Sequence, residues 1–196
     1  MLQLLIGLAL FLGIHSLQSL APEVRARAQQ RLGAWGYKGV YAAIAAIGLY
    51  LTVQGYGLAR LTPEPVWTPP PGMQHASLLL MWLAMVLWVA SYVPGNQLLA
   101  KLRHPMTLSV KVWALGHLLA NGNLADLVLF GGFLLWSVLV FRAARQRDRR
   151  RMTPAPEATA GRTWLAVCLG TGLWAAFLVG GVHLWLIGVD PLVRPG

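Results

Sequence analysis

Charged residues are scarce in this sequence. They make up 11% of its 196 residues, whereas a soluble domain averages about 25%. So few charges cannot cover a solvated surface, which excludes an ordinary soluble protein. The nine tryptophans and five tyrosines suit a membrane protein instead, because such rings favour the two membrane interfaces.

Acidic residues and cysteine are scarcer still. Six Asp and Glu stand against 16 Lys and Arg, a net charge of +10 that in a soluble protein would indicate a nucleic-acid partner. Here the basic residues lie between apolar stretches, so we expect them to orient the chain in a membrane and expect no nucleic acid to bind. Cys168 is the only cysteine, which excludes an intramolecular disulfide and a Cys-x-x-Cys-His attachment of haem.

Long apolar runs take the place of the missing charges. A helix needs about 20 apolar residues to cross the hydrocarbon core, and six stretches come near that length. We therefore predict one all-α membrane domain over residues 1–196, a bundle of six transmembrane helices. Asn-Gly-Asn at 121–123 predicts a tight turn between the fourth and the fifth. The predicted spans are residues 2–20, 39–59, 76–93, 107–121, 124–141 and 163–187.

The segments between these spans differ in character. Residues 21–38, with Pro22 near their start, predict a short amphipathic helix at the membrane interface. Residues 60–75 contain five prolines and are expected to be extended and stiff. Residues 142–162 form a basic run, which we expect to be an irregular cytoplasmic loop that contacts anionic lipid head groups.

The last predicted span carries a stripe of small residues. Gly172, Ala176 and Gly180 recur every four residues. Such a stripe lets another backbone or a flat ligand approach closely, and helix packing is the favoured interpretation. Cys168 lies in the same apolar run, where we expect it to be an inert small hydrophobe.

Basic residues divide unevenly between the two sides of the predicted bundle. With six spans, segments 21–38, 94–106 and 142–162 share one side and carry four, two and seven Lys and Arg, 13 of the chain's 16. Lys and Arg accumulate on the cytoplasmic side of membrane proteins. The division therefore predicts both termini on the non-cytoplasmic side, whereas an odd number of spans would mix the charges.

Two of the five histidines lie inside predicted spans and have polar neighbours on the same helical face. Gln18 and Ser19 follow His15 by three and four residues, which places them on its helical face. Trp113 precedes His117 by one turn, and Asn121 follows it by one turn. Ionisable side chains within membrane helices usually face the protein interior and have a function. Each of the two is a candidate ligand, and the alternative for each is a buried histidine that bonds to a neighbouring helix.

Depth relates these two histidines to each other. At about 1.5 Å per residue, His15 lies about 20 Å from the outer end of its helix, and His117 about 15 Å from the cytoplasmic end of its own. In a core of about 30 Å both fall near the middle. A b-type haem requires paired histidines from different helices, so His15 and His117 are candidate iron ligands, with Trp113 and Asn121 beside the ring. Zinc is less favoured, because no acid or thiol accompanies the histidines in the spans.

The other three histidines are interpreted differently. His104 precedes His117 by 13 residues, a net helical rotation of about 220°, so the two cannot ligate one centre from one side. Pro105 favours a helix start, which puts His104 at the cytoplasmic interface. An interfacial position explains His75, and His183 is either a supporting group or an alternative ligand.

Several motifs together resemble the NnrU family of bacterial membrane proteins. They are His15-Ser16, the segment Tyr92–Asn96, the segment Arg103–Met106, the run Lys111–Gly122 and the closing segment His183–Val189. The resemblance covers nearly the whole chain. It implies a multi-pass protein of the bacterial inner membrane with a link to the expression of nitrite and nitric oxide reductases in denitrification.

The same family is similar to the 15-cis-zeta-carotene isomerases of plants and cyanobacteria, which are haem b membrane enzymes. That likeness implies haem b held by His15 and His117, a further site histidine at His104, and redox-controlled isomerisation of a hydrophobic polyene. The isomerases have a cysteine three residues before the second ligand, where this chain has Ala114. This departure puts their exchange of iron ligands in doubt here.

Other functions stay open at this point. Arg103-His104-Pro105 also resembles the motif with which isoprenylcysteine carboxyl methyltransferases bind S-adenosylmethionine, although the paired glutamates which that family carries near its C-terminus are missing. A non-enzymatic assembly factor for the denitrification machinery is a further alternative. The partners expected are the lipid bilayer, a polyene substrate and further copies of the chain in a homo-oligomer.

Overall fold

The fold is all-helical. The computed structural model describes residues 1–152, 154 and 156–192, and these contain eight helices. In chain order they are α1 (Leu2–Leu20), α2 (Pro22–Ala59), α3 (Met73–Ala90), α4 (Gln97–Leu102), α5 (Pro105–Ala120), α6 (Leu124–Arg151), α7 (Ala160–Leu178) and α8 (Val182–Ile187).

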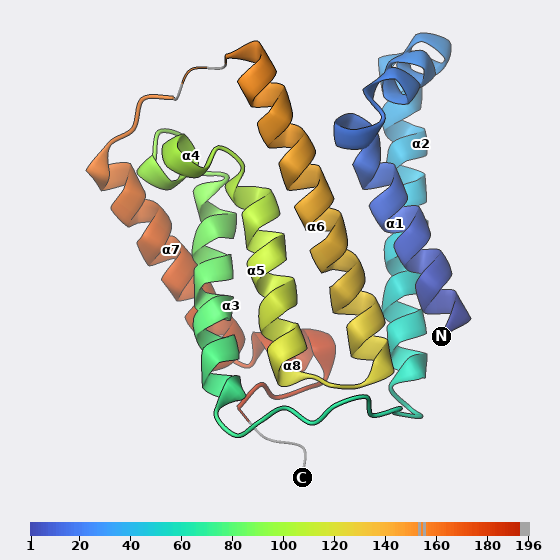
Figure 1. Cartoon of the computed structure of the whole chain (residues 1–196), viewed down its shortest axis with the longest axis vertical. Coiled ribbons are helices and arrows are strands. Elements are labelled where there is room, and N and C mark those ends of the chain that lie inside the picture. The colour runs from blue at the N-terminus through green and yellow to red at the C-terminus, as the bar shows by residue number, and fades with distance from the viewer. Residues whose placement is uncertain (153, 155, 193–196) are drawn as a thin grey trace.

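Helix α6 occupies the middle of the bundle (Figure 1). On one side α1 and α2 form an antiparallel pair, and on the other side α5, α3 and α7 follow one another. Glycine makes the close approach of α1 and α2 possible, because a Cβ at Gly48 would lie 2.6 Å from the backbone nitrogen of Phe11. The core joins both sides, with Leu4 and Leu8 of α1 packed in one cluster with Ala114 of α5 and Phe130 of α6.

The outer surface of the bundle is apolar. Large aliphatic side chains point outward from several helices, among them Leu79 on α3 and Leu135 on α6, both more than 60% exposed. By length and composition, and within the described residues, four helices are long and apolar enough to cross a membrane: α1, α2, α3 and α6. Exposed apolar surface of this extent suits lipid rather than water, so the chain is a multi-pass membrane protein.

Several local predictions are confirmed. A helix starts at Pro22, and Gly33, with φ of 69° and ψ of 171°, separates its first part from the rest of α2. Helix α5 starts at Pro105, and the turn at residues 121–123 leads directly into α6. The proline-rich segment contains no helix from Arg60 to Gly72. It pairs instead with that turn, since the Val66 N–H donates to the Gly122 carbonyl at 2.8 Å.

Three predictions about the basic loop and the last span are wrong. The loop expected at 142–162 is helical through Arg151, because α6 continues without interruption past its apolar part. The single span expected at 163–187 is divided, since positive φ at Gly181 ends the run and separates α7 from α8. A Cβ at Gly172 of the small-residue stripe would meet nothing within 4 Å, whereas a Cβ at Gly170 would lie 2.6 Å from the Val86 Cα of α3, so Gly170 makes the close contact instead.

Two further features were not anticipated. Cys168 is exposed on the outer surface of α7, where it faces outward with the neighbouring apolar side chains. The short helix α4 was missed, although Asn96 caps it by accepting a hydrogen bond from the Leu99 N–H at 2.8 Å. Asn96 also donates to the Ala90 carbonyl at 2.8 Å, which fixes α4 against the end of α3.

Candidate functional site

His15 and His117 are held in the same way by their own helices. The His15 Nδ1 lies 2.6 Å from the Phe11 carbonyl oxygen, and the His117 Nδ1 lies 2.9 Å from the Trp113 carbonyl oxygen. A carbonyl only accepts, so in each pair Nδ1–H donates and Nε2 keeps its lone pair. This is how ligand histidines are usually oriented, with one ring nitrogen fixed by a hydrogen bond and the other available to a metal.

A series of aromatic contacts runs from one histidine to the other. The His15 ring lies 4.3 Å from the Phe11 ring, which lies 6.0 Å from Phe133 of α6. Phe133 in turn lies 5.4 Å from Trp113, whose ring is 4.9 Å from His117, all between ring centroids. Aromatic rings therefore form much of the surroundings of both histidines.

The two histidines do not lie at one height, which corrects the expectation from helix lengths. His117 is in the last turn of α5, whereas His15 lies in the second half of α1, five residues before that helix ends at Leu20. Contacts with α6 show the offset. Trp136 donates to Ser16, the neighbour of His15, while Phe130 stacks on His117 at 4.4 Å. Six residues along α6 correspond to about 9 Å.

Trp113 and Asn121 both support His117, as their shared face predicted. Trp113 accepts the Nδ1 proton with its carbonyl and packs its ring beside the imidazole. Asn121 caps α5 and donates from Nδ2 to the His117 carbonyl at 2.8 Å. Hydrogen bonds therefore fix both the ring and the backbone carbonyl of His117 in the last turn of α5.

Sequence reasoning missed a polar pair close to this site. The Tyr56 hydroxyl donates to Asp126 Oδ1 at 2.5 Å, and Asp126 is only 3% exposed. The Tyr56 ring lies 6.1 Å from Phe130, which stacks on His117. One signal was present in the sequence: Asn123 followed three residues later by Asp126 is a capping pattern, and the structure contains that capping box.

His104 lies apart from the other site residues. Its Nε2 is 2.9 Å from Asp148 Oδ2, near the end of α6, and its ring lies 6.2 Å from Phe141. The neighbouring Arg103 donates to the Pro154 carbonyl at 2.8 Å. The Arg-His-Pro motif thus makes contacts within the chain at the basic end of the bundle, and a methyltransferase role for it stays a prediction.

His183 and His75 lie toward the opposite end of the bundle. His183, in α8, has its Nδ1 2.7 Å from the Val189 carbonyl and lies close enough to His117 to interact with it electrostatically. His75 is in the first turn of α3. Within the described residues, no three His, Cys, Asp or Glu side chains come together as a metal site. The candidate ligands are therefore single imidazoles on separate helices.

One family matches the chain. The sequence profile described as NnrU protein matches residues 3–191, which is nearly the whole length. Searches of curated proteins and of solved structures find no match.

Proposed function

The chain belongs to the NnrU protein family, and on this premise we propose that it binds haem b in the bacterial inner membrane with His15 and His117 as iron ligands. The observation that carries the proposal is their common geometry, with each Nδ1 bound to the carbonyl four residues earlier and each Nε2 left available.

The donor chemistry suits a haem, and apolar rings surround both donors. Neutral imidazole nitrogens are suitable axial ligands, and the rings of Phe11, Phe133 and Trp113 offer apolar faces for a porphyrin. These rings also fill the space between the two histidines. Ligation of one iron by both histidines would therefore require these rings to move.

The chain's own residues would determine the properties of the site. Bound haem would supply reversible one-electron redox chemistry at the iron. The Trp113 carbonyl holds the His117 tautomer, and Asn121 fixes the backbone that carries it. Phe130 and Trp113 cover the imidazole and exclude water, which also affects the reduction potential.

The proposed topology has six membrane crossings, with both termini outside the cytoplasm. α5 and α7 would supply the two crossings beyond the four long apolar helices. The support is the arrangement in Figure 1, where the start of α1, the α5–α6 turn and α8 lie at one end of the bundle. The basic end of α6, α4 and the first part of α2 lie at the other, and Lys and Arg accumulate on the cytoplasmic side.

We infer redox-controlled cis–trans isomerisation of a lipid-soluble polyene as the reaction class, with a role in expression of nitrite and nitric oxide reductases as the alternative. The support is the resemblance to the carotene isomerases. Ala114 is fully buried among Leu4, Leu8 and Phe130, so the cysteine-dependent ligand exchange of those enzymes is not expected here.

An optical spectrum tests the haem proposal. Full-length protein produced with ample haem and purified in detergent is expected to show a Soret band and reduced α and β bands. His15→Ala and His117→Ala are expected to lose or shift these bands, because each removes one axial nitrogen. His75→Ala and His104→Ala, which lie away from the pair, serve as controls and should leave the spectrum unchanged.

Two outcomes would contradict the assignment. Wild-type protein without a Soret band removes haem binding altogether. Loss of the band in His183→Ala together with its retention in His15→Ala would show that the imidazole of α8, not that of α1, is the second ligand.

A further inference from the structure

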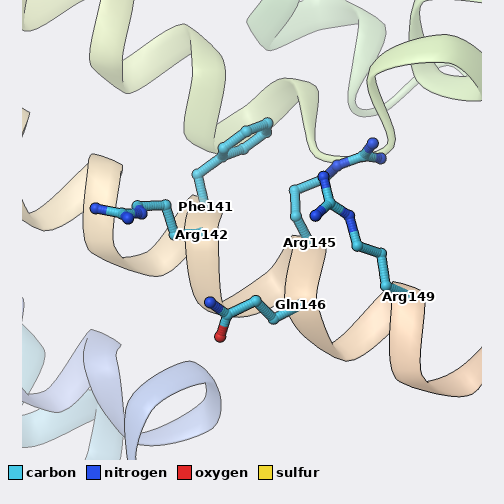
Figure 2. A pocket seen from close by; sticks show the side chains of 5 residues that line it. All are labelled: Phe141, Arg142, Arg145, Gln146 and Arg149. Carbon is cyan, nitrogen blue, oxygen red and sulfur yellow. The ribbon is translucent and has the colours of Figure 1, made fainter.

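A cluster of arginines surrounds two adjoining hollows where α6 leaves its apolar part. One hollow of about 270 Å³ is lined by Phe141, Arg142, Arg145, Gln146 and Arg149. The second, of about 300 Å³, is lined by Arg103, Arg145, Asp148, Arg149 and Met152. Arg145 and Arg149 belong to both. Figure 2 shows these two side chains extending to the same side of α6, toward the segment that contains α4 and α5.

Within the described residues, Arg142, Arg145 and Arg149 of this cluster form no ion pair. Over the residues that the structure describes, the ion pairs are Arg27–Glu23 and His104–Asp148. Asp148, the one acid that lines a hollow, is thus already engaged by His104 at 2.9 Å. Guanidinium groups gathered in this way repel one another and favour an anion that can accept several N–H donors, above all a phosphate.

The backbone around Arg103 has an unusual conformation at this place. Arg103 ends α4 with φ of 69°, a region that residues other than glycine seldom adopt. This conformation turns the chain from α4 into α5 and places the Arg103 side chain at the wall of the second hollow. Glycine would permit the turn without strain, whereas the arginine here donates from its guanidinium to the Pro154 carbonyl at 2.8 Å at the edge of the hollow.

An apolar stripe leads along α6 to the same hollows. Leu135 and Leu139 are 62% and 44% exposed, and at helical spacing they share a face with Arg142 and Gln146. Lys111 of α5 lies over the Phe141 ring at 4.7 Å, so a further cation marks the level at which apolar surface gives way to charge. Apolar side chains followed by cations along α6 match the order of groups in a phospholipid, in which acyl chains lead to a phosphate.

We propose that these hollows form a binding site for an anionic phospholipid of the cytoplasmic leaflet, and that a lipid with two phosphates occupies it best. Basic hollows between helices on the cytoplasmic side are suited to such head groups. Arg145 and Arg149, shared by both hollows, bind the two phosphates, with Arg142 and Arg103 at either side. The acyl chains lie along Leu135 and Leu139. The site is independent of haem.

Lipid titration of delipidated full-length protein in detergent tests this. Binding is measured by native mass spectrometry with cardiolipin, phosphatidylglycerol, phosphatidylcholine and pyrophosphate. The expected order of affinity is cardiolipin, then phosphatidylglycerol, then phosphatidylcholine. Arg145→Gln/Arg149→Gln is expected to weaken cardiolipin binding about 30-fold, since loss of each direct guanidinium–phosphate hydrogen bond costs roughly a factor of five.

Arg150→Gln/Arg151→Gln is the matched control, because it removes the same charge from exposed positions of the same helix that line neither hollow. It is expected to change cardiolipin affinity by less than about threefold. Equal losses of cardiolipin affinity in the two double variants would show that overall charge, not these two arginines, determines binding, and would overturn the proposed site. Equal binding of phosphatidylcholine would overturn the role of phosphate charge.

Free pyrophosphate provides the remaining distinction. Pyrophosphate that binds as tightly as cardiolipin would show a site for a soluble anion and overturn the lipid assignment. If the double variant fails to fold, Arg149→Gln alone, at an exposed position, is expected to weaken cardiolipin binding about fivefold through the loss of one guanidinium–phosphate hydrogen bond, and unchanged binding would count against the proposal. The haem spectrum should be the same in all these variants, so failure here is separate from failure of the haem proposal.

Discussion

The Tyr56 hydroxyl of α2 donates to the Asp126 carboxylate of α6 at 2.5 Å. The bond joins two helices through residues that are 70 positions apart in the chain. The second oxygen of the same carboxylate accepts from the Asn123 backbone N–H at 3.1 Å. One buried acid thus caps α6 and ties the α1–α2 pair to the rest of the bundle.

Removing the hydroxyl of Tyr56 should destabilise the protein. Tyr56→Phe leaves a buried carboxylate oxygen without its donor, which is expected to lower the free energy of unfolding by about 1.5–3 kcal/mol. Thermal unfolding in detergent, followed by circular dichroism, measures the change. Tyr50→Phe on the same helix is the control, because Tyr50 is 63% exposed. Equal effects of the two substitutions would show that the Tyr56–Asp126 bond contributes nothing specific.

A methyl group at Gly48 should separate α1 from α2. Its Cβ would lie 2.6 Å from the Phe11 nitrogen, so Gly48→Ala forces a backbone shift with an expected cost of about 1–3 kcal/mol. Gly57→Ala on the same helix meets nothing within 4 Å and should be neutral or stabilising by up to about 1 kcal/mol. Thermal unfolding of the two variants in the same detergent, followed by circular dichroism, compares their stability. A Gly48→Ala protein as stable as wild type would refute the tight α1–α2 contact.

Asn121 should affect haem affinity without ligating iron. Asn121→Ala removes the hydrogen bond to the His117 carbonyl, and loosening a ligand's support typically lowers metal affinity about 10-fold or more. Haem titration of the apoprotein measures the affinity, and we expect a higher Kd with an unchanged Soret maximum. Gln54→Ala, an exposed amide on α2, should leave the Kd as in wild type. A shifted maximum in Asn121→Ala would indicate that the iron ligands themselves have changed.

Single cysteines test the proposed six-span topology. In a Cys168→Ser background, Glu64→Cys should react with a membrane-impermeant maleimide in right-side-out vesicles, because the proposed topology places the segment between α2 and α3 outside. Arg150→Cys should react only after detergent is added, because the proposed topology places the basic end of α6 in the cytoplasm. The reverse pattern would invert the orientation, and reaction of both in intact vesicles would contradict the odd number of crossings proposed between the two positions.

Much of the fold could be predicted because its signals are local. Apolar length predicted α1, α3 and the apolar part of α6, and Pro22 and Pro105 predicted helix starts. The break between α7 and α8 was missed, because glycine is tolerated within membrane helices and only the positive φ of Gly181 shows that the chain turns there. Helical structure from residue 142 to 151 was missed, since a run of arginines is compatible with both loop and helix.

The sequence by itself determined the membrane class, the basic end of the bundle and the pairing of Trp113 and Asn121 with His117, because composition and helical spacing act within one segment. Only the tertiary structure decided what lies between segments. It offset His15 from His117 along α6, engaged His104 with Asp148, and brought Tyr56 to Asp126. Such relationships depend on the packing of helices against one another, and no spacing within a single helix records them.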